Sequence, residues 1–334
     1  MNPSNRTRLV IDGLIFHSDG NPEPMLTGGV HAANITIAPI FADLSAALDS
    51  CMTWQKIAGR SDSGWLIVKQ SNDILLAKQS GKAALIMGWQ NTLAWENSLD
   101  LIDHFHSAGI RIVQLTHNDA NFIGDGCAEK RNAGLTNFGR QAVQRMNDVG
   151  IAIDLSHCAE ATMLDAARLT SKPLLVTHSG AKAVDDRVRN KSDIALKAVA
   201  ETGGVIGASI HGFLNWNGDP KFPPSLENYV RHVRYIANLV GIEHVGIGTD
   251  HACVQDPKEA EPILQMNRDR YPGVSSSFVK AFGNTLSSRY PKEVPSPRKF
   301  SGILEALDEH GFSESEIDLV AGQNFLRAFR EIWG

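Results

Sequence analysis

The sequence predicts an α/β fold of the (β/α)8 TIM barrel class, with further helices at the C-terminal end of the chain. Eight short apolar runs rich in β-branched residues recur along the sequence, and most are followed by a stretch with helical periodicity. This alternation is typical of βα units built around a parallel sheet. Eight such units favour a closed barrel, although the number of strands does not by itself exclude an open, doubly wound sheet.

The expected strands cover residues 9–16, 33–40, 83–89, 111–116, 151–156, 174–177, 205–210 and 244–249. The expected helices between them cover residues 44–57, 99–108, 137–149, 160–169, 193–201 and 226–240. Ser225 is expected to cap the last of these helices, with Asn228 three residues further on in an imperfect capping box. Two closing helices are expected at 303–310 and 315–333.

Residues 254–300 follow the eighth expected strand and show no clear periodicity. We expect a long loop there, and its length is typical of a lid over a functional site. No internal repeat or low-complexity tract divides the chain, and α/β barrels of this length commonly form one unit. One domain is therefore expected over residues 1–334.

Composition and charge exclude several classes of partner. The net charge is −5, and no cluster of Lys and Arg is interleaved with aromatic residues, which argues against nucleic acid. The first residues are polar, and no apolar window is long enough to span a bilayer, so we expect a cytoplasmic protein without a membrane partner. The four cysteines form no C-x-x-C pair, and reduced thiols are expected.

Polar side chains follow the expected strands, at the end of the barrel where active sites of this fold lie. Six of the eight strands are followed by a histidine, namely His17, His117, His157, His178, His211 and His251. Asp250 precedes the last of these, and Gln90 follows the third strand. Neutral imidazole and carboxylate are the ligands that zinc, iron and manganese favour, so the pattern predicts a metal site.

Other catalytic arrangements lack their essential residues. No lysine ends the fourth expected strand, which argues against barrels that bridge two metals with a carbamylated lysine. Neither a G-x-S-x-G motif nor a Gly-rich phosphate loop is present. A serine hydrolase would therefore have no nucleophile, and a nucleotide would have no phosphate cradle.

A series of short motifs runs along the chain in a characteristic order. It comprises Gly134-Leu135-Thr136, Asp154-Leu155-Ser156-His157, Thr177-His178-Ser179, Arg189-Asn190, Gly246-Ile247-Gly248-Thr249-Asp250 and Gly322-Gln323-Asn324-Phe325-Leu326-Arg327. In its order and spacing this series resembles the membrane (renal) dipeptidase family of the metal-dependent hydrolase superfamily.

The resemblance implies a zinc-dependent barrel that hydrolyses dipeptides, often with a D-residue at the C-terminal position. It implies that His157 and His178 bind one metal ion, and that His117 polarises the scissile carbonyl or stabilises its oxyanion. It implies that Arg189 holds the terminal carboxylate of the substrate, a task suited to a guanidinium fork. Asp250 would bind metal and handle the proton passed to the leaving amine. The resemblance also implies a homodimer.

The chain departs from the family pattern at the first metal of the usual pair. The family's first strand ends Asp-Gly-His-x-Asp, whereas residues 12–16 read Asp-Gly-Leu-Ile-Phe. The bridging Glu of the family is replaced by Gln90. A His-x-Asp occurs three residues late, at His17 and Asp19, and it could restore the pair only if a bulge absorbed those three residues. The alternatives are a polar loop there and a single ion on His157 and His178, completed by Asp250, Gln90, His251 or water.

Three functions follow from these observations. The first is a hydrolase with one zinc or other divalent ion that cleaves the amide bond of a dipeptide or a similar small substrate with a carboxylate. The second is a barrel that binds a small carboxylate ligand without hydrolysing it. The third is a repurposed enzyme that hydrolyses a lactam or another C–N bond.

Overall fold

Eight parallel strands close into a barrel in the computed structural model, which describes residues 8–334. The polar residues 1–7, where we expected no leader segment, lie outside the described residues. The strands are β1 (Ile11–Ser18), β2 (Ala32–Thr36), β4 (Ala83–Trp89), β5 (Ile110–Gln114), β6 (Ala152–Asp154), β7 (Leu175–Ser179), β8 (Val205–Ala208) and β9 (Val245–Ile247). All eight lie where the apolar runs predicted strands.

The barrel closes where β1 pairs with β9, through Asp12 and Ile247. The carboxylate of Asp12 is buried at this seam and accepts hydrogen bonds from the backbone N–H and the hydroxyl of Thr249, at 2.9 and 2.5 Å. It also accepts from the N–H of Leu14, at 3.2 Å. Three donors on one buried carboxylate thus join the first barrel strand to the residues that follow the last.

Two short strands and two short helices were not predicted. β3 (Trp65–Ile67) pairs with β4 outside the barrel, and β10 (His251–Cys253) pairs with the end of β1. α2 (Glu23–Gly28) and α4 (Asn72–Gln79) are only six and eight residues long. Elements this short carry too few residues for a periodic pattern to be visible in the sequence.

The outer helices agree closely with the prediction. They are α3 (Leu44–Ala58), α5 (Asp100–Ser107), α6 (Asn137–Val149), α7 (Glu160–Leu169), α8 (Asp193–Glu201) and α9 (Leu226–Val240). α6, α8 and α9 begin after Thr136, Ser192 and Ser225, whose hydroxyls each accept a hydrogen bond from the N–H three residues on. These side chains satisfy N–H groups that the first turn of a helix leaves without a backbone partner.

Residues 254–300 are not the long irregular loop that we expected. They contain 3-10 turns at Pro257–Ala260, Ser287–Arg289 and Pro297–Lys299, and the helices α10 (Glu261–Arg270) and α11 (Pro272–Phe282). Leu264 is the one buried side chain of α10, so the helix has almost no apolar stripe to betray it in the sequence. The two helices are joined through the single residue Tyr271.

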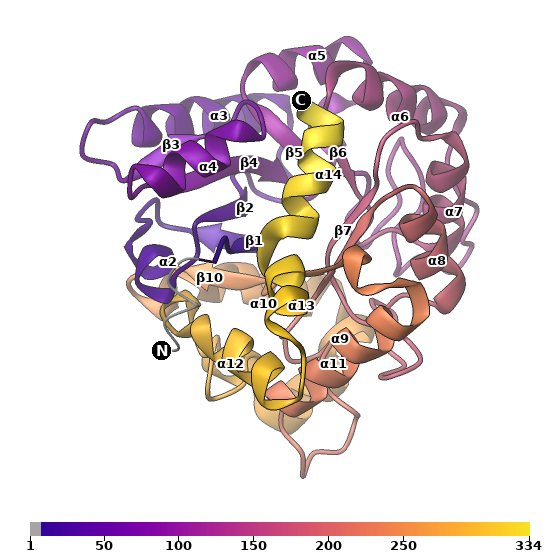
Figure 1. Ribbon diagram of the computed structural model, residues 1–334. Coiled ribbons are helices and arrows are strands. Elements are labelled where there is room, and N and C mark those ends of the chain that lie inside the picture. The colour runs from indigo at the N-terminus through magenta and orange to yellow at the C-terminus, as the bar shows by residue number, and fades with distance from the viewer. Residues whose placement is uncertain (1–7) are drawn as a thin grey trace.

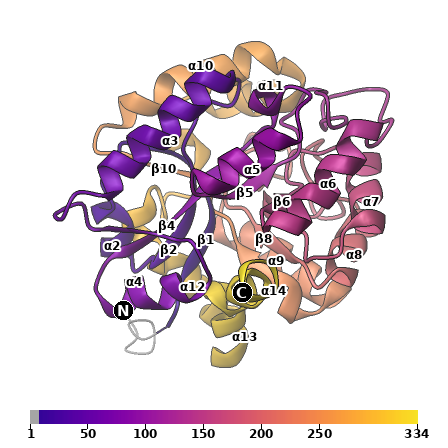
Figure 2. The same cartoon turned by 90° about the horizontal axis from the view of Figure 1, so that it is seen from above.

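The chain ends in α12 (Ser301–Glu309), α13 (Glu314–Asp318), a π-helical turn at Leu319–Gln323 and α14 (Asn324–Trp333). The predicted closing helix 315–333 is therefore interrupted by one wide turn. In Figure 1, α14 lies across the near side of the barrel, and Figure 2 shows α10 and α11 at the opposite side. The amide of Asn324 donates to the carbonyls of Ile242 and Val245, so α14 covers the N-terminal ends of the strands.

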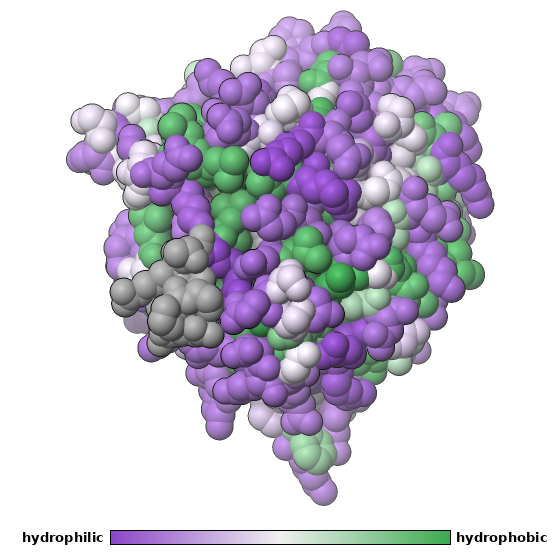
Figure 3. Space-filling model, in the orientation of Figure 1, coloured by the Kyte–Doolittle hydropathy of each residue, from purple (hydrophilic) through white to green (hydrophobic). Residues whose placement is uncertain are grey.

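The face that carries α14 is largely hydrophilic, with hydrophobic side chains in small separate areas (Figure 3). Among the described residues, no helix is both long and apolar enough to cross a membrane. The apolar side chains of the barrel and its helices are instead buried together in the core.

Candidate active site

A pocket opens at the C-terminal ends of the barrel strands, on the side where α10 and α11 lie. Five of the residues predicted to form a site border it, namely Gln90, His117, His157, Arg189 and Asp250. His178, the sixth, lies behind His157 and is fully buried. Strand ends that are far apart in sequence thus meet at one edge of the barrel, as the prediction required.

The imidazoles of His157 and His178 face one another. Their Nε2 atoms lie 3.0 Å apart. Nδ1 of His157 lies 2.8 Å from the side-chain oxygen of Asn118, which also accepts from the thiol of Cys127. An amide oxygen has no proton to give, so this contact assigns the proton of the His157 ring to Nδ1.

The tautomer of His178 is fixed by a chain of hydrogen bonds that starts at Asp154. The carboxylate of Asp154 accepts from the N–H and hydroxyl of Ser156 and from the N–H and hydroxyl of Thr177, at 2.6–3.0 Å. Burial raises the pKa of Asp154, but these four donors oppose the rise and favour its ionised form. The hydroxyl proton of Thr177 then goes to Asp154, and the Thr177 oxygen accepts from Nδ1–H of His178, at 2.8 Å. Both imidazoles therefore carry their lone pairs on Nε2.

Two lone pairs at this distance repel each other unless a positive charge lies between them. A proton is disfavoured, since burial and the charge of Arg189 hold the pKa of His157 and His178 well below the usual value for histidine. A metal cation satisfies both nitrogens at once, and each ring is already held through its other nitrogen as metal-binding histidines are. The donor chemistry of this pair therefore fits a metal ion.

The position of β7, which carries His178, depends on three glycines. A Cβ atom at Gly13, Gly207 or Gly248 would lie 2.4, 2.1 or 1.8 Å from the carbonyl oxygen of Thr177. These glycines belong to β1, to β8 and to the segment after β9, so β7 is closely surrounded at the residue before His178. Any side chain at these positions would push β7 aside, which explains the glycines of the predicted motifs.

The other predicted residues border the pocket in different ways. The ring of His117 stacks on that of His157, with centroids 4.1 Å apart, and its Nδ1 is buried without a partner among the described residues. The side-chain nitrogen of Gln90 donates to the hydroxyl of Thr36, at 2.8 Å. Across residues 8–334, however, no group of three or more His, Cys, Asp or Glu side chains is arranged to hold a metal ion.

Asp250 adopts an unusual backbone conformation at the edge of the pocket. Its φ is +57°, in the left-handed region that non-glycine residues seldom enter. Its N–H donates to the carbonyl of Leu14 at 3.0 Å, and its carbonyl accepts from the hydroxyl of Tyr290 at 2.5 Å. Burial raises the pKa of its carboxyl to about 7, although Arg189 and Arg289 act in the opposite direction. The group can therefore exist in either protonation state near neutral pH.

The late His-x-Asp does not reach the pocket. The pairing of β1 shifts register twice, but His17 borders a neighbouring cavity together with Trp54 and Glu259. The carboxylate of Asp19 accepts from the backbone N–H groups of residues 21 and 255, each at 2.9 Å, and so closes a surface turn. Phe16, which ends the altered Asp-Gly-Leu-Ile-Phe segment, borders both cavities with its apolar ring.

Arg189 lies 1 % exposed beneath the pocket, so it is not a surface arginine. Its guanidinium donates to two backbone carbonyls, those of Ser156 and His178. Its Nε–H has no partner among the described residues. Backbone carbonyls carry no formal charge, so these two hydrogen bonds do not neutralise the guanidinium of Arg189.

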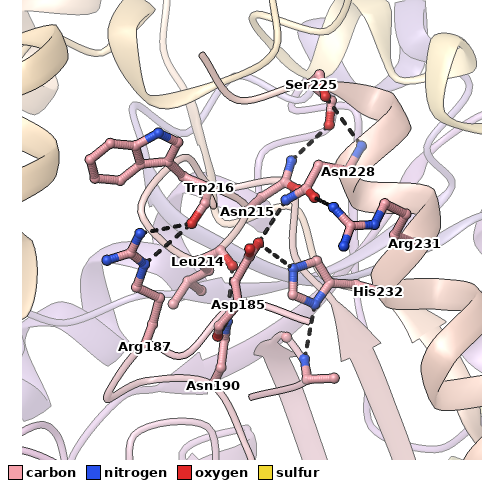
Figure 4. A network of polar contacts seen from close by, with 12 residues as sticks. Asp185, Arg187, Asn190, Leu214, Asn215, Trp216, Ser225, Asn228, Arg231 and His232 are labelled. Carbon is pink, nitrogen blue, oxygen red and sulfur yellow. Dashed lines mark hydrogen bonds and ion pairs between the residues drawn. The ribbon is translucent and has the colours of Figure 1, made fainter. Parts of the chain in front are cut away.

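A buried polar network holds the segment between β7 and α8 that carries Arg189 (Figure 4). Asp185 accepts from Nε2–H of His232 at 2.9 Å and from the amide of Asn228 at 2.7 Å. Nδ1 of His232 accepts from the N–H of Ala181 at 3.0 Å, and the amide of Asn190 donates to the carbonyls of Asp185 and Leu214. The segment is thereby tied to α9 and to the loop after β8. His232 is neither a ligand nor solvent-facing, but a structural residue.

Sequence reasoning missed several residues of the pocket. His211 was named among the histidines that follow the strands but was given no role, and it is 2 % exposed and borders the pocket. Leu264, Tyr271 and Arg289 come from residues 254–300, which the sequence presented only as a loop. Arg289 was detectable only as an arginine in a segment otherwise expected to cover the site.

Known proteins are similar to this chain in sequence and in fold. The family model described as membrane dipeptidase (peptidase family M19) matches residues 17–268. Dipeptidase tcpJ of Claviceps purpurea (strain 20.1) is 29% identical over 267 residues, which are 79% of this chain and 54% of that protein. The uncharacterized dipeptidase C965.12 of Schizosaccharomyces pombe is 27% identical over 234 residues, 64% of this chain and 54% of that protein. The chain spans about half the length of these curated relatives.

Solved structures agree with the barrel. An amidohydrolase from Pseudomonas aeruginosa superposes with a TM-score of 0.85 at 28% identity, over 99% of this chain and 98% of that one. A metallopeptidase from Rhodobacter sphaeroides, liganded with a phosphinate mimic of L-Ala-D-Ala, gives 0.77 at 20% identity, over 98% and 99% of the two chains. The predicted TIM barrel is confirmed, and because the family model covers most of the sequence, the chain belongs to the membrane dipeptidase family, whose members depend on metal ions.

Proposed function

We propose that this chain is a metal-dependent hydrolase that cleaves the amide bond of a dipeptide or of a similar small substrate bearing a carboxylate. The observation that carries the proposal is the pair of Nε2 lone pairs of His157 and His178, which face each other at 3.0 Å. Membership of a family of metal-dependent dipeptidases supports it. So does the buried guanidinium of Arg189 beside the same pocket.

One ion, zinc or another divalent metal, is proposed rather than two. Phe16 and Gln90 border the pocket where the family pattern would supply charged ligands, and His17 and Asp19 lie outside it. His157 and His178 would hold the ion, with Asp250, Gln90 or solvent completing its coordination. A bound divalent ion lowers the pKa of water and polarises a carbonyl.

The remaining roles belong to side chains of the pocket. Arg189 would bind the substrate's terminal carboxylate, since its guanidinium is fixed and its hydrogen bonds go to uncharged backbone carbonyls. Asp250 would take up a proton from the attacking water and pass it to the leaving amine, because it is the one acidic side chain among the described residues that border the pocket. His117, with an unpaired Nδ1, would contact the substrate carbonyl.

A second candidate is a barrel that binds a small carboxylate ligand and no longer hydrolyses it. It is favoured by one observation: among the described residues, no third His, Cys, Asp or Glu completes a metal-binding group with His157 and His178. The two candidates differ in metal content and in turnover, which can be measured on the same preparation.

Metal content by plasma mass spectrometry, together with dipeptide hydrolysis, tests the proposal. We expect about one equivalent of metal in the purified protein, lost in His157→Ala and kept in His104→Ala, a variant of an exposed histidine of α5. Hydrolysis should be lost with the metal. Two equivalents would contradict the single ion. Absence of both metal and turnover, with a small carboxylate still bound, would favour the second candidate.

A further inference from the structure

Two buried guanidiniums border the same pocket. Arg189 comes from the segment between β7 and α8, and Arg289 comes from the 3-10 turn Ser287–Arg289; they are 1 % and 4 % exposed. Asp250 is the one acidic side chain among the described residues that border the pocket. The pocket therefore holds more positive than negative formal charge, even when Asp250 is ionised.

The charge of Arg289 is not balanced by its own contacts. One terminal nitrogen donates to Nε2 of His211 at 3.1 Å, and the other donates to the side-chain oxygen of Asn284 at 2.6 Å. Both acceptors are neutral, since an imidazole that accepts at Nε2 carries its proton on Nδ1. A buried cation surrounded by neutral acceptors is costly unless a ligand supplies the opposite charge.

Unused hydrogen-bond donors accompany this charge. Nε of Arg289, Nε of Arg189 and Nδ1 of His211 are each buried without a partner in the part of the chain that the structure describes. Buried N–H groups are nearly always paired, and unpaired ones in a pocket point to a missing acceptor. If Arg289 served only to link His211 to Asn284, it would need neither its positive charge nor these free donors.

Arg289 is held firmly in this position. Its carbonyl accepts from the N–H of Gly212 at 2.6 Å, which fastens the turn to the loop after β8. A Cβ at Gly212 would lie 2.5 Å from the ring of Phe278 and 3.0 Å from the carbonyl oxygen of Arg289. The guanidinium is thus presented by a closely packed backbone, and rigid placement is what an anion-binding arginine requires.

We propose that the pocket takes a substrate with two anionic groups, so that Arg189 binds the terminal carboxylate and Arg289 binds a second carboxylate on a side chain. The substrate class is then a dipeptide, or a related N-acyl amino acid, that contains aspartate or glutamate. This inference rests on the proposed function for the hydrolytic step, but the binding of a dicarboxylate does not depend on it.

Binding and hydrolysis are measured with matched acid and amide ligands. The ligands are N-acetylglutamate against N-acetylglutamine, and Ala-Glu against Ala-Gln in both configurations of the second residue. These pairs differ in charge but hardly in size. We expect the acid to bind at least about tenfold more tightly by calorimetry, the gain typical of a charged hydrogen bond. The same ratio is expected in kcat/KM.

Arg289→Gln should abolish this preference by weakening the acid and leaving the amide almost unchanged, and Arg289→Lys should restore part of it. Arg268→Gln is the matched control, because it removes one positive charge from the exposed surface of α10. A structural role alone would weaken both ligands of each pair equally and would lower the melting temperature.

The inference is overturned if wild-type protein binds acid and amide equally, or if the preference survives in Arg289→Gln. Hydrolysis of neutral dipeptides without a preference for acidic ones would leave the proposed function standing and remove only this inference. Selective binding of N-acetylglutamate without turnover of any dipeptide would support this inference and remove the proposed function.

Discussion

The side-chain oxygen of Asn118 lies 2.8 Å from Nδ1 of His157 and turns the other ring nitrogen toward His178. Removing this acceptor in Asn118→Ala should weaken metal binding by roughly 10–100-fold, the usual effect of losing a residue that orients a metal ligand. Titration with a competing chelator measures the change. Asn238→Ala, an exposed position of α9, is the control. Unchanged affinity in Asn118→Ala would show that this contact does not orient the ring.

The raised pKa of Asp250 predicts that the stability of the fold depends on pH, and it fixes the sign of that dependence. In the folded chain its carboxyl keeps a proton up to about pH 7, whereas an ordinary carboxyl loses it near 3.8. Unfolding therefore releases a proton between these values, and the free energy of unfolding falls as pH rises, by up to about 1.4 kcal/mol per unit. Asp250→Asn cannot ionise and should gain stability relative to wild type over this range.

Urea unfolding of both proteins with a metal chelator, at several pH values from 4.5 to about 8, measures this difference. Asp12, whose pKa burial also raises to about 7, is present in both proteins, so the part of its contribution that does not depend on the charge of Asp250 cancels. The prediction is wrong if the stability difference between the two proteins does not change with pH.

Gly248 and Gly273 make a matched pair for the packing around β7. Gly248→Ala places Cβ 1.8 Å from the carbonyl oxygen of Thr177, so we expect a loss of about 1–3 kcal/mol or more, as is typical of overpacking. Gly273, in α11, has no atom within 4 Å of an added Cβ. Its replacement by Ala should be neutral or stabilising by up to about 1 kcal/mol.

A second readout distinguishes crowding at β7 from a general loss of stability. Because His178 follows Thr177 directly, Gly248→Ala should weaken metal binding as well as folding, whereas Gly273→Ala should leave metal binding unchanged. Full metal affinity in a folded Gly248→Ala protein would contradict the claim that this glycine positions His178.

The network of Asp185 should matter for both stability and binding. In Asp185→Ala the buried N–H of His232 loses its acceptor, which costs about 1–3 kcal/mol, and the half-buried amide of Asn228 loses one of its two acceptors. Its neighbour Asp186 is exposed and makes only a surface ion pair with Lys182, so Asp186→Ala should change stability by less than about 0.5 kcal/mol. Chemical denaturation measures both.

Because the Asp185 network carries the segment of Arg189, Asp185→Ala should also raise KM for a carboxylate substrate at temperatures where the variant is folded. Combining it with Arg189→Gln tests the connection, since the two effects on KM should then be far from additive. Additive effects would indicate that the network does not position Arg189.

The sequence was informative wherever a physical pattern is local. Apolar runs and the cap at Ser225 placed the strands and outer helices within a few residues, because burial and capping leave a mark at each position. The meeting of His117, His157 and Asp250 was also foreseeable, since parallel strands of a barrel end at one edge.

What could not be foreseen depends on contacts between distant segments. The helix α10 buries Leu264 alone, so its sequence lacks an apolar stripe. Arg289 enters the pocket because Gly212 fastens its turn, a contact between residues 77 positions apart that no local pattern reveals. The late His17 and Asp19 matched a ligand spacing, but the pairing of β1 with β10 leads them away from the site.

The seam between Asp12 and Thr249 joins positions 237 residues apart. Such a contact forms late, because the entropy lost in closing so long a loop is recovered only when both ends are already structured. Until then β1 and β9 each present an open edge to which other chains can pair. Newly made or heated protein should therefore be most prone to aggregate just before the barrel closes, and Asp12 helps to set how long that interval lasts.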